Sequence, residues 1–348
     1  MAFEPPFCPR PLCSQHREPA PGFCIRYGFY QPKCRDKPLQ RFRCRFCRST
    51  FSVQAFRLDY HDRRPEVNVR AFQSLTSGVG FRQTARTVEM GNSALQYKAR
   101  KLARHAGLLH DNLSARLPAG RTYVLDEEET YEKASIRTLT MPLVIERENW
   151  FVVATSVGST RRLAPEGTDR RAWQDAEEAA SGPRPDQSRE CVAEVLKQLD
   201  SRVGGTSLGL LTDEKSSYGT LSREIFGDRV DHQTTSSRLP RGTFNPLFPI
   251  NTTLAMTRDN LGRLRRQSWL VTKERRCLRL HMNLFTVYRN YIRVRFNRDK
   301  EGDSPAVRLQ LVSRNLTFPA ALGWRQDWGQ LSIHPLSLDG SRRVSVPA

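Results

Sequence analysis

The sequence lacks any long apolar run. No stretch of the 348 residues approaches the ~18 consecutive apolar residues that a membrane-spanning helix needs. Its first residues, MAFEPPFCPRPLC, are rich in proline and lack the apolar core of a secretory signal peptide. We therefore expect an intracellular protein with no membrane partner.

Acidic residues are scarce relative to basic ones. The chain has 36 Asp and Glu against 56 Lys and Arg, a net charge of +20, and its basic residues occur from Arg17 to Arg343 instead of in one tail. A positive charge of this size favours a polyanionic partner. We expect that partner to be nucleic acid.

Cysteine is nearly absent after residue 47, since six of the eight cysteines lie between Cys8 and Cys47. In a reducing compartment such a cluster indicates a metal site and not disulfides. Four residues separate Cys8 from Cys13, and two separate Cys44 from Cys47. Two such pairs can close a tetrahedral site of four thiolates. Residues 1–60 are therefore predicted to form a zinc ribbon whose Zn²⁺ ligands are Cys8, Cys13, Cys44 and Cys47.

The long gap between the two cysteine pairs leaves an alternative open. Cys24 and Cys34 lie inside this gap, which is longer than in the usual ribbon pattern. Either of them could compete as a zinc ligand.

From Val67 to His105 the apolar residues recur with a helical period. Gly91 breaks the pattern, and a further helix follows in which Leu95, Ala99 and Leu102 face inward. Two helices joined by a short turn containing glycine are typical of a helix-turn-helix. We expect such a DNA-binding domain over residues 65–118. Its outward face would contact DNA through Gln96, Tyr97, Arg100 and Arg104.

Two apolar runs end in an aspartate. TYVL leads into Asp126, and LGLLT leads into Asp213, so each carboxylate is predicted to lie at the end of a buried strand. Paired carboxylates at strand ends are typical of a two-metal nuclease core. The alternative is that each aspartate only caps a strand or begins a turn.

The segments around these aspartates predict an α/β domain. Residues 141–145 and 150–157 are expected to complete an antiparallel meander with the first strand. Residues 158–189 are polar and are expected to form an irregular loop, and residues 251–291 a long helical region. Together these elements predict a ribonuclease-H-like mixed sheet flanked by helices over residues 121–297. The whole chain is then an α/β multidomain protein, with a loosely packed tail over residues 298–348.

In this order, a CxxC knuckle that ends in TFS, a helix-turn-helix and a core with Asp126 and Asp213 resemble the bacterial insertion-sequence transposases with an N-terminal zinc ribbon. The resemblance covers residues 8–297. In that family the third metal ligand begins a helix and precedes a motif of the type RxTxxxSK. Alignment on Arg266, Ser268 and Lys273 places Asn251 at the third position, where some related transposases carry Asn instead of Glu.

Two residues remain candidates for the third metal ligand. Asn251 offers one neutral oxygen and could equally cap a helix, and Asp259 is a charged alternative eight residues later. Beyond this position we expect basic side chains to hold DNA phosphates without sequence preference. These are Arg263, Arg265, Arg266 and Lys273.

The resemblance implies a transposase. It would bind the terminal repeats and the target as double-stranded DNA, and would cleave and join strands with Mg²⁺ or Mn²⁺ held by Asp126, Asp213 and Asn251. It would act as a homo-oligomer on DNA in the bacterial nucleoid. Two alternatives stay open: a catalytically inert, transposase-derived DNA-binding regulator, and a nuclease of the same fold without strand transfer.

Overall fold

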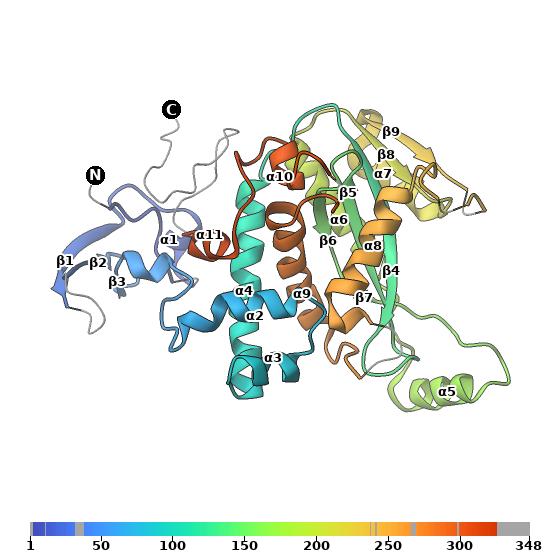
Figure 1. Cartoon of the computed structure of the whole chain (residues 1–348), viewed down its shortest axis with the longest axis horizontal. Coiled ribbons are helices and arrows are strands. Elements are labelled where there is room, and N and C mark those ends of the chain that lie inside the picture. Colours follow the sequence, from blue (N-terminus) through green and yellow to red (C-terminus); the bar gives the residue numbers. More distant parts are fainter. Residues whose placement is uncertain are drawn as a thin grey trace.

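Two sheets lie at opposite ends of the molecule, and long helices fill the space between them (Figure 1). The computed structural model describes residues 3–10, 12–31, 38–236, 238–240, 242–265, 269–297 and 299–325. In these ranges no helix is both long enough and apolar enough to cross a membrane.

The N-terminal end holds an antiparallel sheet of three strands in the order β1-β2-β3. Its elements are α1 (Ser14–Arg17), β1 (Cys24–Tyr30), β2 (Leu39–Cys44), β3 (Thr50–Phe51) and the 3₁₀ turn η1 (Val53–Phe56). Phenylalanine rings and cysteines make its small interior, in which Phe42 stacks on Phe51 with ring centroids 6.0 Å apart. So small a core buries little apolar surface, and domains of this size usually need a metal or disulfides to stay folded.

Helices follow in the next segment. These are η2 (Pro65–Val67), α2 (Asn68–Leu75), α3 (Phe81–Thr87) and α4 (Asn92–Leu113). Leu95, Ala99 and Leu102 are buried, as the sequence predicts. However, α4 continues for 22 residues, beyond the predicted helical pattern, and packs along α9 (Arg275–Val287). One apolar core extends from Leu58 to Trp324, so these helices share their core with the larger sheet.

The larger sheet has the strand order β6-β5-β4-β8-β9, with β7 paired to β5. Its strands are β4 (Thr122–Tyr131), β5 (Thr138–Glu146), β6 (Val152–Thr155), β7 (Gly158–Ser159), β8 (Leu208–Thr212) and β9 (Val230–Thr234). β4, β5 and β6 form the predicted antiparallel meander. β8 and β9 continue the sheet on the other side of β4 and run parallel to it.

Helices cover both faces of this sheet. α6 (Ser188–Val203) and α7 (Ser216–Phe226) lie on one face, where they pack with Tyr123 and Leu125 of β4. α8 (Phe248–Asn260) and α9 lie on the other face with Val124. Alternate side chains of β4 thus pack into two apolar layers, one on each face of the sheet, as expected for a strand covered on both faces.

The long C-terminal helical region is broken, contrary to prediction. α8 ends at Asn260, the 3₁₀ turn η4 (Gly262–Leu264) follows, and α9 begins only at Arg275 and passes into the π-helical turn η5 (Tyr288–Ile292). Gly262 packs against the turn after α2, where an added Cβ would lie 3.0 Å from the Gly78 carbonyl oxygen. This close backbone approach holds the chain in a turn where a continuous helix was expected.

Residues 158–189 are not entirely irregular, because they contain the exposed helix α5 (Asp169–Ser181). Figure 1 shows α5 projecting beyond the sheet. Only Gln174 of this helix is buried, although Ala172, Trp173, Ala176, Ala179 and Ala180 recur at helical spacing in its sequence.

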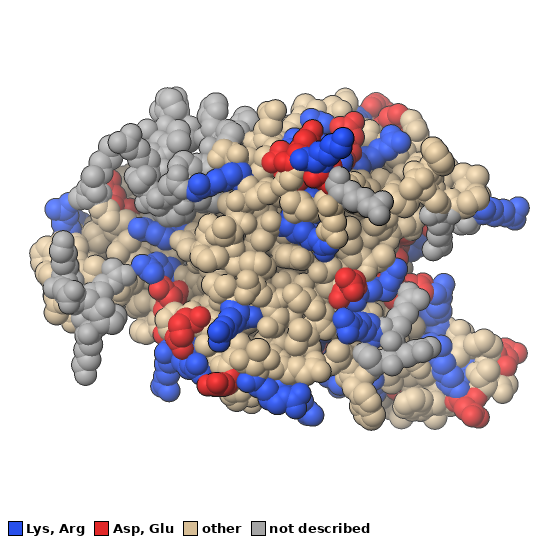
Figure 2. All heavy atoms as spheres, viewed as in Figure 1, with Lys and Arg blue, Asp and Glu red and all other residues tan. Residues whose placement is uncertain are grey.

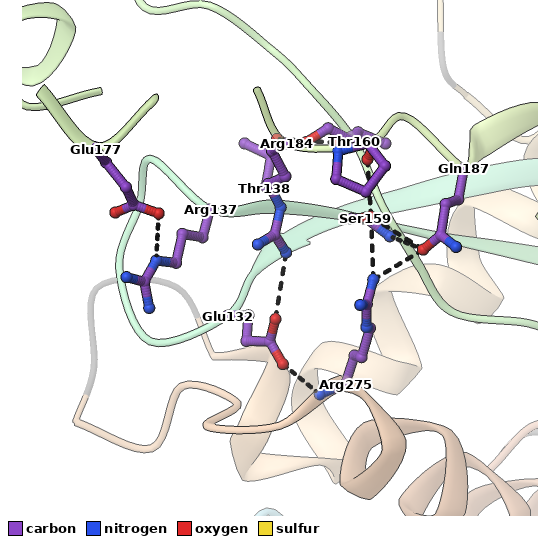
Figure 3. Close-up of polar contacts among 10 residues, drawn as sticks. Glu132, Arg137, Thr138, Ser159, Thr160, Glu177, Arg184, Gln187 and Arg275 are labelled. Carbon is purple, nitrogen blue, oxygen red and sulfur yellow. Dashed lines mark hydrogen bonds and ion pairs between the residues drawn. The ribbon is translucent and has the colours of Figure 1, made fainter. Parts of the chain in front are cut away.

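Polar contacts connect residues 158–189 to the sheet and to the start of α9 (Figure 3). Arg137 Nε donates to Glu177 at 2.7 Å, and Arg184 pairs with Glu132 at 3.2 Å. Glu132 also accepts the backbone amide of Arg275 at 2.7 Å. The end of β4 is thereby connected to both segments.

The segment after the sheet domain is packed, so the prediction of a loose tail is wrong for residues 299–325. α10 (Pro305–Arg308) and α11 (Phe318–Gly323) lie here. The Phe318 ring packs edge-on against Phe72 at 5.2 Å. Apolar residues from this segment are buried in the common core: Ala306, Leu309, Val312, Leu316, Ala321 and Trp324.

A buried ion pair connects the segment before α2 to α4. Lys98 Nζ lies 2.7 Å from Asp62 Oδ1, and the two side chains are only 5% and 9% exposed. Asn68 and the Arg64 carbonyl also accept from this ammonium group, at 2.7 and 2.9 Å. We predict that Asp62→Ala lowers the free energy of unfolding by ~3–5 kcal/mol, because it leaves Lys98 buried without its counter-charge.

The matched control is Asp59→Ala, which breaks the much more exposed Arg57–Asp59 pair. Exposed pairs of this kind contribute under ~1 kcal/mol, so this variant should remain close to the native protein. Urea denaturation compares the two variants. Equal, small losses would show that Lys98 does not depend on Asp62.

Candidate active site and metal centre

The N-terminal sheet brings four cysteines together. The sulfur atoms of Cys8, Cys13, Cys44 and Cys47 all lie within 4.8 Å of one another. Two of their separations are 3.6 Å, from Cys8 to Cys47, and 3.9 Å, from Cys13 to Cys44. A tetrahedral site with Zn–S bonds of about 2.3 Å would separate its sulfurs by about 3.8 Å. This set could hold a metal ion and is compatible with zinc.

The surroundings act differently on the clustered thiols: burial raises the pKa of Cys8 to about 12 and also raises the pKa of Cys13. Burial opposes ionisation of Cys47, but hydrogen bonds with the hydroxyl and amide of Ser49 outweigh it and lower the pKa of this thiol to about 6. The thiolate is the form that binds a metal. Cys24 pairs with Cys44 across β1 and β2, yet it lies outside the sulfur cluster. Cys34 falls outside the described residues.

The two candidate aspartates lie two residues beyond the last paired residues, Val124 and Leu211, of the parallel strands β4 and β8. Thr122, Tyr123 and Val124 pair with residues 87 positions later, and Asp126 and Asp213 have this same separation. Continuing the register by two residues therefore places their backbones side by side. Both side chains are half-buried. Asp126 shares the parity of Val124, whose side chain packs under α8, so it belongs to the α8 face of the sheet. Asp213 follows the last residue of β8, in a turn where its Oδ1 accepts the Lys215 amide.

Glu127 of β4, whose side chain is on the other face of the sheet, forms hydrogen bonds with the segment that follows Asp213. Lys215 Nζ and Tyr218 Oη both donate to Glu127 Oε1, at 2.5 and 2.7 Å, and Thr140 donates to Oε2. Asp213 Oδ1 itself accepts the backbone amide of Lys215 at 3.0 Å. Glu127 thus connects the segment after Asp213 to the residue beside Asp126.

Tyr218 lies in the negative potential of these acids. Burial raises the pKa of its hydroxyl, and the charges of Glu127, Asp126 and Asp213 act in the same direction. The sequence motif around Asp213 includes Tyr218, but nothing in its pattern indicates a partner on a strand 91 residues away.

α8 runs beside β4 in the same direction (Figure 1). At its start, the Phe248 ring lies 5.8 Å from that of Trp150, in the turn beside the first residues of β4. Near its end, Arg258 pairs with Glu128, later in the same strand. Asn251 lies between these two contacts and about two turns before Arg258, so both side chains leave the same side of the helix. That side lies next to the buried face of the helix, which is formed by Ile250, Thr253, Leu254 and Thr257, and Asn251 itself is half-buried.

Asp259 is less well placed than Asn251. It is exposed, and it is rotated by about 80° around α8 from Asn251. Its end of the helix packs against the turn at Gly78, whose amide donates to the carbonyl of Asn260 at 2.7 Å. Across the described ranges, the four cysteines are the only group of three or more His, Cys, Asp or Glu side chains close enough to share an ion. A third ligand for the aspartates would then come from another residue type.

Glu128 is a buried acid that sequence reasoning missed. It is 3% exposed and lies on the same strand face as Asp126, two residues away. The sequence shows three glutamates directly after Asp126, but it does not show which of them is buried. Its pairing with Arg258 neutralises a charge that would otherwise be costly to bury.

The predicted DNA contacts fall into two groups. Tyr97, Arg104, Arg265 and Lys273 are exposed, and Arg266 lies outside the described residues. Gln96 and Arg100 were expected to face outward, but they are half-buried and line a pocket with Arg263. The reason is that α9 packs along α4 and covers part of its polar face. Lys and Arg side chains are spread over the face in Figure 2, with acidic groups among them, and do not form a single patch.

No protein-family model matches this chain, and no curated protein matches it.

Removing one sulfur tests the metal centre. We predict that Cys44→Ser loses the bound metal and makes residues 3–60 sensitive to protease, because metal binding supplies most of the stability of so small a core. Cys24→Ser is the matched control, since this cysteine is on the neighbouring strand but outside the cluster. Metal analysis should find one equivalent of zinc in the native protein and in the control. Full zinc content in Cys44→Ser would refute the assignment.

Proposed function

We propose that this protein is a DNA transposase of the insertion-sequence type, which cleaves and joins DNA strands at the α8 face of its larger sheet. The observation that carries the proposal is the parallel pairing of β4 and β8, whose register ends at Val124 and Leu211, two residues before Asp126 and Asp213. An antiparallel meander with two further parallel strands beside its first strand is also the order expected of a ribonuclease-H-like core.

Asp126, Asp213 and Asn251 have distinct roles in this proposal. The two carboxylates would supply charged oxygens for divalent ions, and Asn251 one neutral carbonyl oxygen, so it would hold an ion more weakly than a glutamate would. Mg²⁺ or Mn²⁺, when bound, would activate water and then a 3′-hydroxyl toward a phosphodiester. Glu127, Lys215 and Tyr218 would keep the two carboxylates at a fixed separation.

The rest of the chain would bring the DNA to this site. The four-cysteine cluster is proposed to hold zinc and to stabilise a DNA-binding module next to the helices. Tyr97 and Arg104 on α4, with Arg265 and Lys273, are exposed and available to duplex DNA. The net charge of +20 supports a nucleic-acid partner. Assembly as a homo-oligomer on DNA and location in the bacterial nucleoid follow from this function as predictions.

One feature favours a second candidate, an inert DNA-binding regulator that retains the fold of a transposase. No third acid joins Asp126 and Asp213 among the described residues. If the amide of Asn251 cannot complete the site, DNA binding would persist without cleavage.

Four variants test the proposed site. Asp126→Ala, Asp213→Ala and Asn251→Ala should each abolish Mg²⁺-dependent cleavage, because each removes a ligand oxygen. Asp259→Ala, on the same helix but exposed, should cleave as the native protein does. The substrates are duplexes that cover the DNA flanking the coding sequence, and the readouts are nicks and joined products. Thermal melting confirms that each variant is folded.

The outcomes separate the candidates. An Asn251→Ala protein that cuts normally beside an inactive Asp259→Ala protein would move the third ligand to Asp259. Cleavage without joined products would indicate a nuclease. A native protein that binds these duplexes and never cuts them would favour the regulator.

A further inference from the structure

A pocket lies between α3, α4 and α9, apart from the aspartates. It is partly open to solvent, and the space in it that the centre of a water-sized sphere can occupy is about 30 Å³. Its walls combine apolar and cationic side chains, including Phe81, Gln96, Arg100, Arg263, Cys277 and His281. Two of these side chains carry guanidinium groups, and they come from segments 163 residues apart in the sequence.

Arg263 is a half-buried cation that forms no ion pair with a carboxylate of the described residues. Its guanidinium carbon lies 4.4 Å from the centre of the Phe81 ring. Its Nε is buried and has no hydrogen-bond partner, and among the described residues no carboxylate pairs with this side chain. Burial lowers the pKa of Arg263, Cys277 and Glu274 oppose this shift, and the charge of Arg100 adds a smaller lowering effect. A cation in such surroundings gains substantially from an anionic partner.

The nearest acid does not fill this role. Glu274 is exposed and already holds Arg276, with Nε to Oε2 at 2.6 Å. Arg100, in contrast, adds a second positive charge at the wall of the same pocket. The pocket therefore combines two guanidinium groups, the amide of Gln96 and no neutralising carboxylate.

His281 closes the inner wall and adds no donor. Its Nε2 lies 2.7 Å from the Leu75 carbonyl oxygen, so this nitrogen carries the proton and donates it. The buried Nδ1 has no partner and offers a lone pair. Burial, together with the nearby charge of Arg263, lowers the pKa of His281 to about 3, so the ring stays neutral. Donors to a ligand then come from the two arginines and Gln96.

We propose that this pocket binds a single phosphate group, with Arg263 donating at its base and Arg100 at its wall. A guanidinium presents its N–H groups in a planar fork that matches two phosphate oxygens. The phosphate is assigned to the backbone of duplex DNA. This assignment of the source rests on the proposed function, whereas the binding of phosphate does not.

The key variant is Arg263→Gln, which removes the charge and keeps a polar side chain. Arg279→Gln is the matched control. It also removes one positive charge, but from an exposed position on α9 that lies outside the pocket. Arg263→Lys keeps the charge but loses the fork and should be intermediate. Arg100→Gln serves as a second variant at a less buried position, should Arg263→Gln fail to fold.

Two measurements on the full chain use defined probes. In the first, inorganic phosphate at constant ionic strength should raise the melting temperature of the native protein and of Arg279→Gln, but not of Arg263→Gln. In the second, duplex DNA binding is measured against salt concentration. Loss of one phosphate contact should reduce the slope of log K against log salt by about 1 in Arg263→Gln and in Arg100→Gln. The slope for Arg279→Gln should match that of the native protein.

Each outcome is decisive. A reduced slope in the two pocket variants supports the proposal, whether or not free phosphate alone shifts the melting temperature. A phosphate-induced shift that Arg263→Gln abolishes, with DNA slopes unchanged, would overturn DNA as the source and leave a site for free phosphate. Unchanged slopes and unchanged shifts would overturn the pocket altogether. Absence of cleavage in the native protein, with the slope effect intact, would count against the proposed function alone.

Discussion

The parallel pairing of β4 with β8 is the constraint on which the candidate site depends. These strands are joined through a long connection that includes β5, β6, β7, α5 and α6, and their shared register ends at Val124 and Leu211, two residues before Asp126 and Asp213. A slip of one residue would turn one aspartate to the opposite face of the sheet. The contacts of Lys215 and Tyr218 with Glu127 oppose such a slip, because they extend the connection past the last paired residue of β8.

The same constraint explains why α8 matters. Its start contacts the turn beside the first residues of β4, and its end is held by the pairing of Arg258 with Glu128. A helix held at both ends cannot rotate freely, so the half-buried Asn251 keeps its position beside the buried face of α8. The unbroken core from Leu58 to Trp324 then joins the helices of the N-terminal half to this sheet. In the proposed function, the helix that binds DNA and the sheet that cuts it would then belong to one packed domain.

Local patterns in the sequence predicted the parts whose chemistry is local. The spacing of the cysteines, the alternating strands of the meander and the two apolar runs that end in aspartate each express a short-range requirement, and the structure contains the cysteine cluster and the meander as predicted. What the sequence could not show depends on contacts between distant segments. Gln96 and Arg100 are on the polar face of α4, but α9 covers part of that face. The break after Asn260 follows from the approach of Gly262 to Gly78.

Binding of Mn²⁺ in the presence of duplex DNA, followed by electron paramagnetic resonance, tests the central claim most directly. If Asp126 and Asp213 share a divalent ion, the native protein and Asp259→Asn should bind Mn²⁺ alike. The double variant Asp126→Asn, Asp213→Asn should bind it much more weakly, since two charged oxygens are replaced by neutral ones. Equal binding by the double variant and the native protein would contradict the account.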